Sequence, residues 1–288
     1  PAAFRDVAAE AGLRVPLIMG SDERKDYILE ANGSGVAFVD FDNDGWLDIY
    51  LVNGTRFDTP PDPKPVSRMY RNRRDGTFED VTAKSSTGGY GWGGGVCAGD
   101  IDNDGHADLF VAYWGPNVLY RNKGDGTFEE IAGKAGVAGP AQEWSSGCTF
   151  IDYDRDGLLD LFVTSYQQFD KSRWPVRGSS ANCEWRGLPV FCGPRGLPFG
   201  RVTLFHNRGD GTFEDVSEKS GVRKVPGVYA FTAVAADLNQ DGWTDLYVAS
   251  DSTPSLFLRN NKDGTFTEIG VETSVAFNEH GYEQGGMG

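Results

Sequence analysis

Short apolar runs alternate with polar loops along the whole chain, and these runs have the character of β-strands. "GVAFV" at 35–39 and "DIYLV" at 48–52 are rich in β-branched and aromatic residues, which favours buried strands. The same pairing of runs occurs three more times, at 95–99 with 108–113, 147–151 with 160–165, and 232–236 with 245–250. The chain is therefore predicted to be all-β, with two strands joined by a repeated loop.

The loop between the two runs is acidic and has the same form in all four places. "DFDNDGWLD" at 40–48 is followed by "DIDNDGHAD" at 100–108, "DYDRDGLLD" at 152–160 and "DLNQDGWTD" at 237–245. Carboxylates this close repel one another unless a hard cation lies among them, and Ca²⁺ prefers oxygen ligands of this kind. Glycine at position 6 permits the positive φ that a turn around an ion requires.

We expect positions 1, 3, 5 and 9 of each loop to supply side-chain oxygens to Ca²⁺, and position 7 to supply its backbone carbonyl. Asparagine fits position 3 because its amide carbonyl also coordinates. The predicted ligands are Asp40, Asp42, Asp44, Trp46, Asp48, Asp100, Asp102, Asp104, His106, Asp108, Asp152, Asp154, Asp156, Leu158, Asp160, Asp237, Asn239, Asp241, Trp243 and Asp245.

These loops differ from an EF-hand, which needs a bidentate Glu at position 12 between two helices. Position 12 is Leu51, Val111, Val163 or Val248, and the flanking segments are strand-like. The alternative is an acidic surface turn, because Asp-Gly is a common hairpin sequence. Four loops in one register favour calcium over that alternative.

A second phrase accompanies each acidic loop. It reads "YRNRRDGTFEDV" at 70–81, "YRNKGDGTFEEI" at 120–131, "FHNRGDGTFEDV" at 205–216 and "LRNNKDGTFTEI" at 258–269, and predicts a hairpin that turns at Asp-Gly. Each unit therefore consists of strand A, the calcium loop, strand B, a connection, strand C, a turn and strand D. Repeated four-stranded antiparallel units predict the blades of a β-propeller.

The blades resemble FG-GAP/VCBS repeats, the calcium-loop blades that also occur in the propellers of integrin α-subunits. "FRDVAAEAGL", "YRNKGDGTF" and "CEWRGLPVFCGPRGLP" resemble more narrowly the ASPIC/UnbV group, the bacterial relatives of cartilage acidic protein. Nothing in the chain matches the ASPIC/UnbV module itself. The resemblance implies a calcium-stabilised propeller of about seven blades, of which this chain is a portion. A closed ring of four blades is the alternative.

The repeats divide the chain into four full blades between two partial ones. "FRDVAAEAGL" at 4–13 matches "FEDVTAKSS" at 78–86, which predicts a strand D without a blade of its own. The predicted parts are an outer strand and lead-in at 1–30, blade 1 at 31–83, blade 2 at 84–135, blade 3 at 136–219 with an insert at 165–203, blade 4 at 220–275, and the start of a further blade at 276–288.

The net charge of the chain is consistent with metal-binding loops. The formal net charge is −15, and four Ca²⁺ ions would reduce it to about −7, so most of the acidity is assigned to metal ligation. An acidic chain disfavours nucleic acid as a partner, and no apolar run reaches the ~18 residues of a membrane span. A start at "PAAFRDV" without Met fits a processed form, and we expect a secreted or periplasmic protein.

The four cysteines support an oxidising compartment. Cys183 and Cys192 flank "EWRGLPVF" in the insert, where few apolar residues are available for packing, and a disulfide there is predicted to stabilise the segment by ~2–3 kcal/mol. Cys97 and Cys148 lie three and four residues before their calcium loops. Since this spacing places them on opposite sides of their strands, we expect two buried free thiols.

The connections on the face opposite the calcium loops are the predicted partner surface. They carry exposed-looking aromatics, and the insert is basic, which favours an anionic protein or carbohydrate. The alternative is that these aromatics pack the blade ends. The candidate contact residues are Trp114, Arg173, Trp174, Arg177, Trp185 and Arg186.

We expect a non-catalytic recognition or scaffold module, because no catalytic constellation is recognisable. His106 lies at a metal-loop backbone position, and His206 is expected on the surface of a strand. The alternatives are a propeller-type polysaccharide lyase, which needs a base and a charge-neutralising group in one groove, and a structural subunit of an extracellular assembly.

Overall fold

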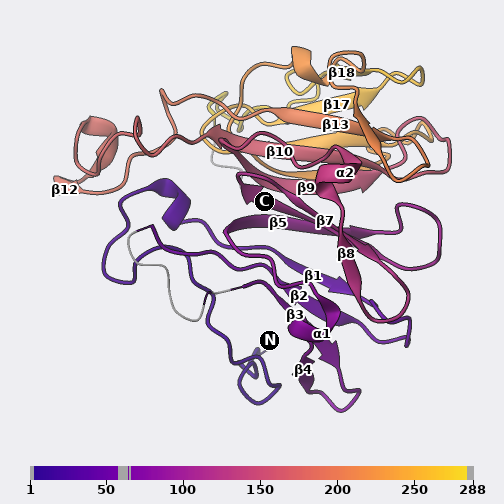
Figure 1. Cartoon of the computed structure of the whole chain (residues 1–288). Helices are drawn as coiled ribbons and strands as arrows, with labels where there is room; N and C mark the ends of the chain where they lie inside the picture. The colour runs from indigo at the N-terminus through magenta and orange to yellow at the C-terminus, as the bar shows by residue number, and fades with distance from the viewer. Residues whose placement is uncertain (1–2, 58–63, 65, 284–288) are drawn as a thin grey trace.

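Four-stranded antiparallel sheets make up the protein, as the repeats predicted (Figure 1). The structure is a computed structural model that describes residues 3–57, 64 and 66–283. Blade 1 consists of β1 (Val36–Val39), β2 (Asp48–Leu51), β3 (Arg68–Asn72) and β4 (Phe78–Asp80). Its strands pair in sequence order, so the chain runs up and down through the sheet.

The other blades repeat this order. Blades 2 and 3 are continuous with each other through a single pair, Trp114 with Trp144. Blade 2 is β5 (Trp92–Gly99), β6 (Asp108–Trp114), β7 (Val118–Asn122) and β8 (Phe128–Glu130). Blade 3 is β9 (Glu143–Ile151), β10 (Asp160–Gln168), β13 (Val202–Asn207) and β14 (Phe213–Asp215). Blade 4 is β15 (Ala230–Ala236), β16 (Asp245–Ser250), β17 (Leu256–Asn260) and β18 (Phe266–Glu268).

Helical turns are short and lie in the connections. The elements are η1 (Ile28–Glu30), α1 (Thr82–Ser85), α2 (Ala132–Ala135), η2 (Ala181–Cys183) and η3 (Val222–Lys224), and a two-stranded hairpin of β11 (Glu184–Trp185) and β12 (Leu188–Pro189) belongs to the insert. No helix in the described part of the chain is long and apolar enough to cross a membrane.

The hydrophobic core lies between the blades. In β6, Leu109 and Val111 belong to the cluster shared with blade 1, whereas Phe110 and Ala112 belong to the cluster shared with blade 3. In β10, Phe162 faces the cluster shared with blade 4. Because alternate residues are buried on both sides of each inner strand, the strand B runs are continuously apolar instead of alternating with polar residues.

Glycines mark the place where the A strands of neighbouring blades come close together. A Cβ on Gly94 would lie 2.8 Å from the Ser145 carbonyl oxygen, and one on Gly147 would lie 2.8 Å from that of Phe231. Any side chain here would push two strands apart, because backbone on the opposite side cannot yield. The inner edges of blades 2, 3 and 4 therefore depend on backbone packing.

Residues 4–13, predicted as a strand D, contain no strand, and residues 8–12 form a turn instead. A strand needs a hydrogen-bonded neighbour, and the described residues supply no strand C for it. The turn nevertheless lies where such a turn would in a repeat: the Ala11 carbonyl accepts the Phe78 N–H at 2.8 Å, as the Ser220 carbonyl accepts the Phe266 N–H at 2.8 Å. The predicted strand is therefore wrong for this segment, and its assignment to a closing blade stays a prediction.

The prediction that Cys97 and Cys148 are free thiols is wrong, because the two form a disulfide between β5 and β9. Their Cα atoms are 5.9 Å apart. The two side chains point to opposite faces of their strands, as expected, and this orientation allows the disulfide instead of preventing it. Neighbouring blades stack the front of one on the back of the next, so side chains from opposite faces of two A strands meet in the interface. This disulfide joins blade 2 to blade 3.

Candidate metal centres and partner surface

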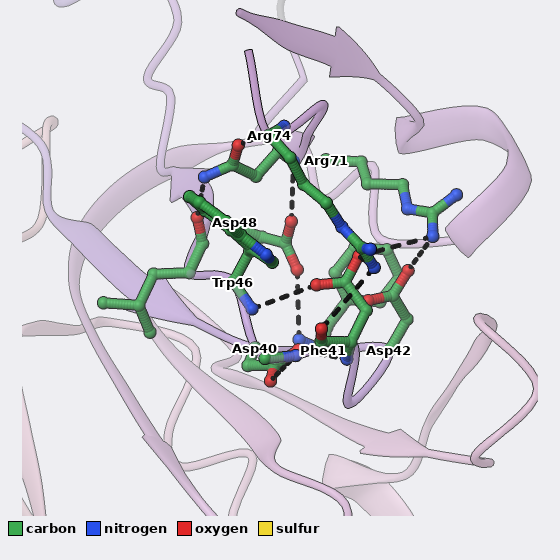
Figure 2. A network of polar contacts seen from close by, with 11 residues as sticks. Asp40, Phe41, Asp42, Trp46, Asp48, Arg71 and Arg74 are labelled. Atoms are coloured by element: carbon green, nitrogen blue, oxygen red, sulfur yellow. Dashed lines mark hydrogen bonds and ion pairs between the residues drawn. The ribbon is translucent and has the colours of Figure 1, made fainter. Parts of the chain in front are cut away.

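Each acidic loop folds around the carboxylate at its first position. In loop 1, Asp40 accepts backbone N–H bonds from Asp44 (2.9 Å) and Gly45 (2.8 Å), and Asp44 accepts one from Trp46 (3.0 Å) (Figure 2). Loops 2 and 4 repeat all three bonds, and loop 3 repeats the last two. The position-6 glycines have φ near +87°, as the sequence pattern required (+86° at Gly45).

The closing aspartate at position 9 is the most buried ligand candidate. Asp48, Asp108, Asp160 and Asp245 are at most 1% exposed. Burial raises the pKa of Asp48 to about 6 and those of Asp108 and Asp160 to about 7, and it also raises the pKa of Asp245. Backbone N–H donors oppose the shift without cancelling it. A cation beside these carboxylates would offset the cost of burying their charge.

Carboxylates at positions 1, 3 and 9 converge in three loops. One ligand atom from each lies within 4.8 Å of the others in the groups Asp40, Asp42 and Asp48; Asp100, Asp102 and Asp108; and Asp152, Asp154 and Asp160. Several oxygens in these groups are buried and have no hydrogen-bond donor, namely Oδ1 of Asp42, Asp102, Asp152 and Asp154. Such oxygens fit a hard cation, because a bound ion supplies the partner that a buried carboxylate oxygen needs.

The remaining predicted ligands lie in different surroundings. Asp44 turns one oxygen toward Arg74 at 2.8 Å, and Asp156 groups with Asp154 and His206. In the fourth loop Asp237, Asn239 and Asp241 are exposed, although Asp245 is buried. The four loops thus share one backbone fold but differ in how far their side chains converge.

The asparagine that ends each strand C connects the loops to the blades, a role that sequence reasoning missed. Its backbone N–H donates to the closing aspartate, for example Asn122 to Asp108 at 2.7 Å. In blades 2 to 4 its side-chain amide also donates to the loop of the preceding blade, as Asn122 does to the Phe41 carbonyl (2.8 Å) and Asn207 to the Ile101 carbonyl (2.7 Å). The invariant Asn within the repeated phrase was the available signal.

Position 4 of the loop also reaches the next loop. Asn43 donates to the Gly105 carbonyl at 2.8 Å, and Asn103 donates to the Gly157 carbonyl at 3.0 Å. In loop 3 the Arg155 guanidinium lies 4.5 Å from the centre of the Trp243 ring. The four acidic loops therefore form one connected surface across the blades.

Basic side chains from strand C face the acidic loops. Arg71 lies 2.7 Å from Asp42, and Arg121 lies 2.6 Å from Asp102. His206 holds the same strand position and lies 3.1 Å from Asp160, half-buried. His206 lies on strand C as expected, but it is only partly exposed: a side chain at this point of strand C points toward the loop, because the C–D turn and the A–B loop lie on the same face.

Most aromatics of the opposite face are buried, so the alternative of packed blade ends holds for them. Trp174 is 6% exposed and packs on Phe169, with ring centres 4.6 Å apart. Trp114 is half-buried and donates its indole N–H to the Phe169 carbonyl at 3.1 Å. These two candidate contact residues belong to an aromatic cluster that contains Trp92, Trp144, Tyr166 and Tyr229. The cluster also anchors the start of the insert, which sequence reasoning had judged poor in packing residues.

The middle of the insert stands away from the sheets as a hairpin (Figure 1). Cys183 and Cys192 form the predicted disulfide at its base. Trp185 pairs with Leu188 across the hairpin, and the two are 59% and 60% exposed. The turn residue Arg186 stacks on the Trp185 ring at 4.6 Å. Trp185, Arg186 and Leu188 are called the hairpin patch below.

The remaining two arginines of the predicted partner surface differ in how exposed they are. Arg173 is 86% exposed and lies 3.6 Å from Asp170. Arg177 is half-buried and donates to the Lys25 carbonyl at 3.5 Å. Arg173 is therefore available to a partner, whereas Arg177 is partly used to join the insert to the N-terminal lead-in.

A cavity of about 280 Å³ between blades 2 and 3 is the place where a catalytic acid or base could be sought. Burial raises the pKa of Glu143, which lines it with Arg201 and Arg223. Glu143 accepts the Arg201 backbone N–H at 2.7 Å, and Arg223 binds the Val202 carbonyl at 3.1 Å. These groups tie strands together, which does not favour the lyase alternative.

Comparison with known proteins agrees with the blade architecture. The sequence profile of the FG-GAP-like repeat matches residues 40–111, 100–163, 190–248 and 237–282. Cartilage acidic protein 1 from Homo sapiens and from Mus musculus are each 34% identical over 245 residues, 82% of this chain. The Xenopus tropicalis protein is 31% identical over 283 residues, 80% of this chain.

These relatives are much longer than the present sequence. The chain spans 33%, 34% and 42% of the human, mouse and frog proteins. A solved structure described as the basis of recognition of non-reducing terminal N-acetylglucosamine by an Agrocybe aegerita lectin aligns with 81% of this chain and 64% of its own, at a TM-score of 0.33 and 19% identity. That likeness is too low to support an inference about fold or ligand. The repeat profile, the four antiparallel blades and the shared acidic loops show that the chain belongs to the FG-GAP-like repeat family.

Proposed function

We propose that this propeller is a non-catalytic recognition module whose blades are held by Ca²⁺ and whose partner binds the hairpin patch. The observation that carries the proposal is the exposure of Trp185 and Leu188 on a disulfide-closed hairpin. A soluble chain does not gain stability from presenting two large apolar side chains in this way. Such residues flanked by arginine are typical anchors of protein interfaces.

The partner is expected to be a protein with an acidic surface. The insert contains more basic than acidic residues on a chain of net charge −15, so an anionic partner is complementary to it and not to the rest of the molecule. Arg186 covers one face of the Trp185 ring. This leaves one face of the ring for a sugar to stack on, whereas the adjacent Leu188 and the arginine offer apolar and charged contacts that suit a protein surface better.

Calcium in this proposal has a structural task. The donorless buried oxygens of Asp42, Asp102 and Asp154, together with the raised pKa of Asp108, support a hard cation at the loops. When bound, Ca²⁺ would neutralise carboxylates that neighbouring blades hold close together. Those blades would then form a rigid base for the hairpin.

Two disulfides and the similarity to cartilage acidic protein 1 support a secreted or periplasmic setting. We also propose that the four blades are part of a larger ring. Val36 and Phe38 on β1 are 52% and 63% exposed, and both lie on the side of β1 away from blade 2, as residues covered by a preceding blade would.

Affinity capture tests the recognition role. The wild-type chain and a Trp185→Ala/Leu188→Ala variant are immobilised and exposed to the secreted proteins of the source cells and, separately, to heparin. We expect one acidic protein to be retained by the wild type only, and Arg173→Glu/Arg186→Glu to weaken its binding at least tenfold. Equal retention by wild type and both variants would contradict the proposal, and binding of heparin alone would replace the protein partner by a polysaccharide.

A further inference from the structure

Arginines of strand C contact the acidic loops through one oxygen of the position-3 aspartate and leave the other oxygen free. Arg71 lies 2.7 Å from Oδ2 of Asp42, whose Oδ1 is buried without a donor (Figure 2). Arg121 lies 2.6 Å from Oδ2 of Asp102, whose Oδ1 is likewise buried without a donor. In both blades, therefore, Oδ2 of the position-3 aspartate pairs with the arginine and Oδ1 has no partner.

The guanidinium groups also approach position 5. Arg71 is 3.6 Å from Asp44 and Arg121 is 3.9 Å from Asp104. In loop 1 a second arginine, from the C–D turn, adds a contact of 2.8 Å between Arg74 and Asp44. The Asp44 carboxylate therefore lies beside two fixed positive charges.

We propose that Arg71 and Arg121 are built-in counter-ions that lower the calcium affinity of loops 1 and 2. The inference rests on the proposed binding of Ca²⁺ to these loops. Arginine cannot lose its proton in a protein, so its charge is permanent. It stabilises the four carboxylates of a loop without calcium, and it repels Ca²⁺ once the ion is bound.

The sign of the effect follows from the charges. Four aspartates give a loop a formal charge of −4, and Ca²⁺ reduces this to −2. A guanidinium therefore interacts more favourably with the loop before the ion binds than afterwards. Its removal should tighten calcium binding about tenfold, the size expected for one charge about 6 Å from a divalent ion in a water-like medium. The same removal should destabilise the calcium-free protein.

The third loop provides the internal contrast. It contains four aspartates as loops 1 and 2 do, but His206 replaces the arginine and lies 3.5 Å from Oδ2 of Asp154. Oδ1 of Asp154 is again buried without a donor. With no guanidinium at this point, loop 3 is inferred to bind Ca²⁺ more tightly than loops 1 and 2. The propeller would then fill its loops in sequence as calcium rises.

Loop 1 can be followed separately because Trp46 is next to its ligands. In a Trp243→Phe background, Tb³⁺ emission excited through Trp46 reports loop 1, and displacement by Ca²⁺ gives the calcium affinity. We expect Arg71→Met to tighten calcium about tenfold and to lower the Tm in EDTA. Arg71→Lys, which keeps the charge, should change the affinity less than threefold.

A control separates local from general charge effects. Arg73→Met removes the same charge two residues away, where the guanidinium pairs with Glu79 at 3.6 Å, and should leave loop 1 within threefold of wild type. Unchanged or weaker calcium binding in Arg71→Met, or equal tightening in Arg73→Met, would overturn the inference while the loops still bind calcium. Absence of any bound ion in native mass spectrometry of the wild type would overturn the proposed function and this inference with it.

Discussion

The two faces of the propeller are built differently, although both belong to the same repeat: one carries the acidic loops (the loop face), and the other carries the variable connections (the connection face). On the loop face, the four units use similar side chains at the same positions, and neighbouring units are joined by hydrogen bonds from side-chain amides to backbone carbonyls, such as Asn122 to Phe41 and Asn43 to Gly105. On the connection face, the units differ in length and composition, and they meet through an irregular aromatic cluster. The residues that every blade needs recur as short motifs, whereas the contacts that are particular to one blade come from its connections.

This difference shows where the stability and the recognition are located. The loop face concentrates carboxylates that are only partly paired with arginines, so its stability is expected to depend on pH and on divalent cations. The connection face buries Trp174 and exposes Trp185 within the same insert, so its stability depends on packing. Each prediction below separates an effect of calcium from an effect of packing.

Removal of calcium should have the largest effect. If four loops bind with Kd of about 10⁻⁴–10⁻³ M, about 10 mM Ca²⁺ stabilises the fold by roughly 6–11 kcal/mol in total. We expect the Tm in EDTA to fall by more than about 10 °C relative to that in calcium. Differential scanning calorimetry checks this, with Mg²⁺ as the control ion. An identical Tm with EDTA and with calcium would contradict a structural role for the ion.

Trp174→Ala should be the next largest effect and should be independent of calcium. The side chain is buried against Phe169, and loss of a buried aromatic costs about 3–5 kcal/mol. Urea unfolding in calcium and in EDTA should give a similar decrease in the free energy of unfolding. A decrease seen only in calcium would mean that the aromatic cluster depends on the loops.

The effect of Asp108→Asn on stability, unlike that of Trp174→Ala, should depend on calcium. The substitution removes the buried charge and one ligand, so it should lower stability by about 2–3 kcal/mol in calcium. In EDTA it should be neutral or stabilising, because the Asp108 carboxylate is costly to bury and its pKa is raised to about 7. Calorimetry under both conditions checks this. Destabilisation in EDTA as well would show that Asp108 acts through its hydrogen bonds to Ile101 and Asn122 instead of through an ion.

The loop face was largely predictable from sequence because identical residues recur at identical spacing. Repetition located the strands, the turns and the clustered aspartates such as Asp48, whose role as metal ligands stays a prediction. It did not reveal the partners of Asn122 and Arg71, since a motif shows that a residue recurs and not what it contacts. Only the stacking of successive blades places the amide of one blade against the loop of another.

The connection face was poorly predictable for the same reason. Trp174 and Trp185 lie in one insert with similar neighbours in sequence, yet one is buried and the other exposed. Their difference arises from distant segments, since Phe57 and Trp114 also pack on Phe169 beside Trp174. The Cys97–Cys148 bond was missed because face-to-back stacking of blades, and not strand parity alone, decides which side chains meet.

Lowering the pH should reduce the difference between the Tm measured in calcium and the Tm measured in EDTA. The pKa values of Asp48, Asp108 and Asp160 are raised in the calcium-free fold, above the ordinary value of 3.8. Such groups destabilise the fold when ionised, so lowering the pH from 8 to 5 through their folded pKa restores stability in EDTA. Protons also compete with Ca²⁺ for the same oxygens. The Tm difference between the two conditions should therefore shrink as the pH falls, and a constant difference would contradict this.

Trp185→Ala should have the smallest effect on the fold, and it is the matched counterpart of Trp174→Ala. Trp185 is 59% exposed and packs mainly against Arg186 and Leu188, so its loss should change the free energy of unfolding by less than about 0.5 kcal/mol, in calcium or in EDTA. Binding of the captured acidic partner, measured by surface plasmon resonance, should nevertheless weaken more than tenfold, since exposed tryptophans in interfaces contribute about 2 kcal/mol or more. A stable variant that keeps full affinity would place recognition elsewhere on the connection face. A variant that loses stability would mean that the hairpin is part of the propeller's own packing, and the division between the two faces would then lie inside the insert and not at its base.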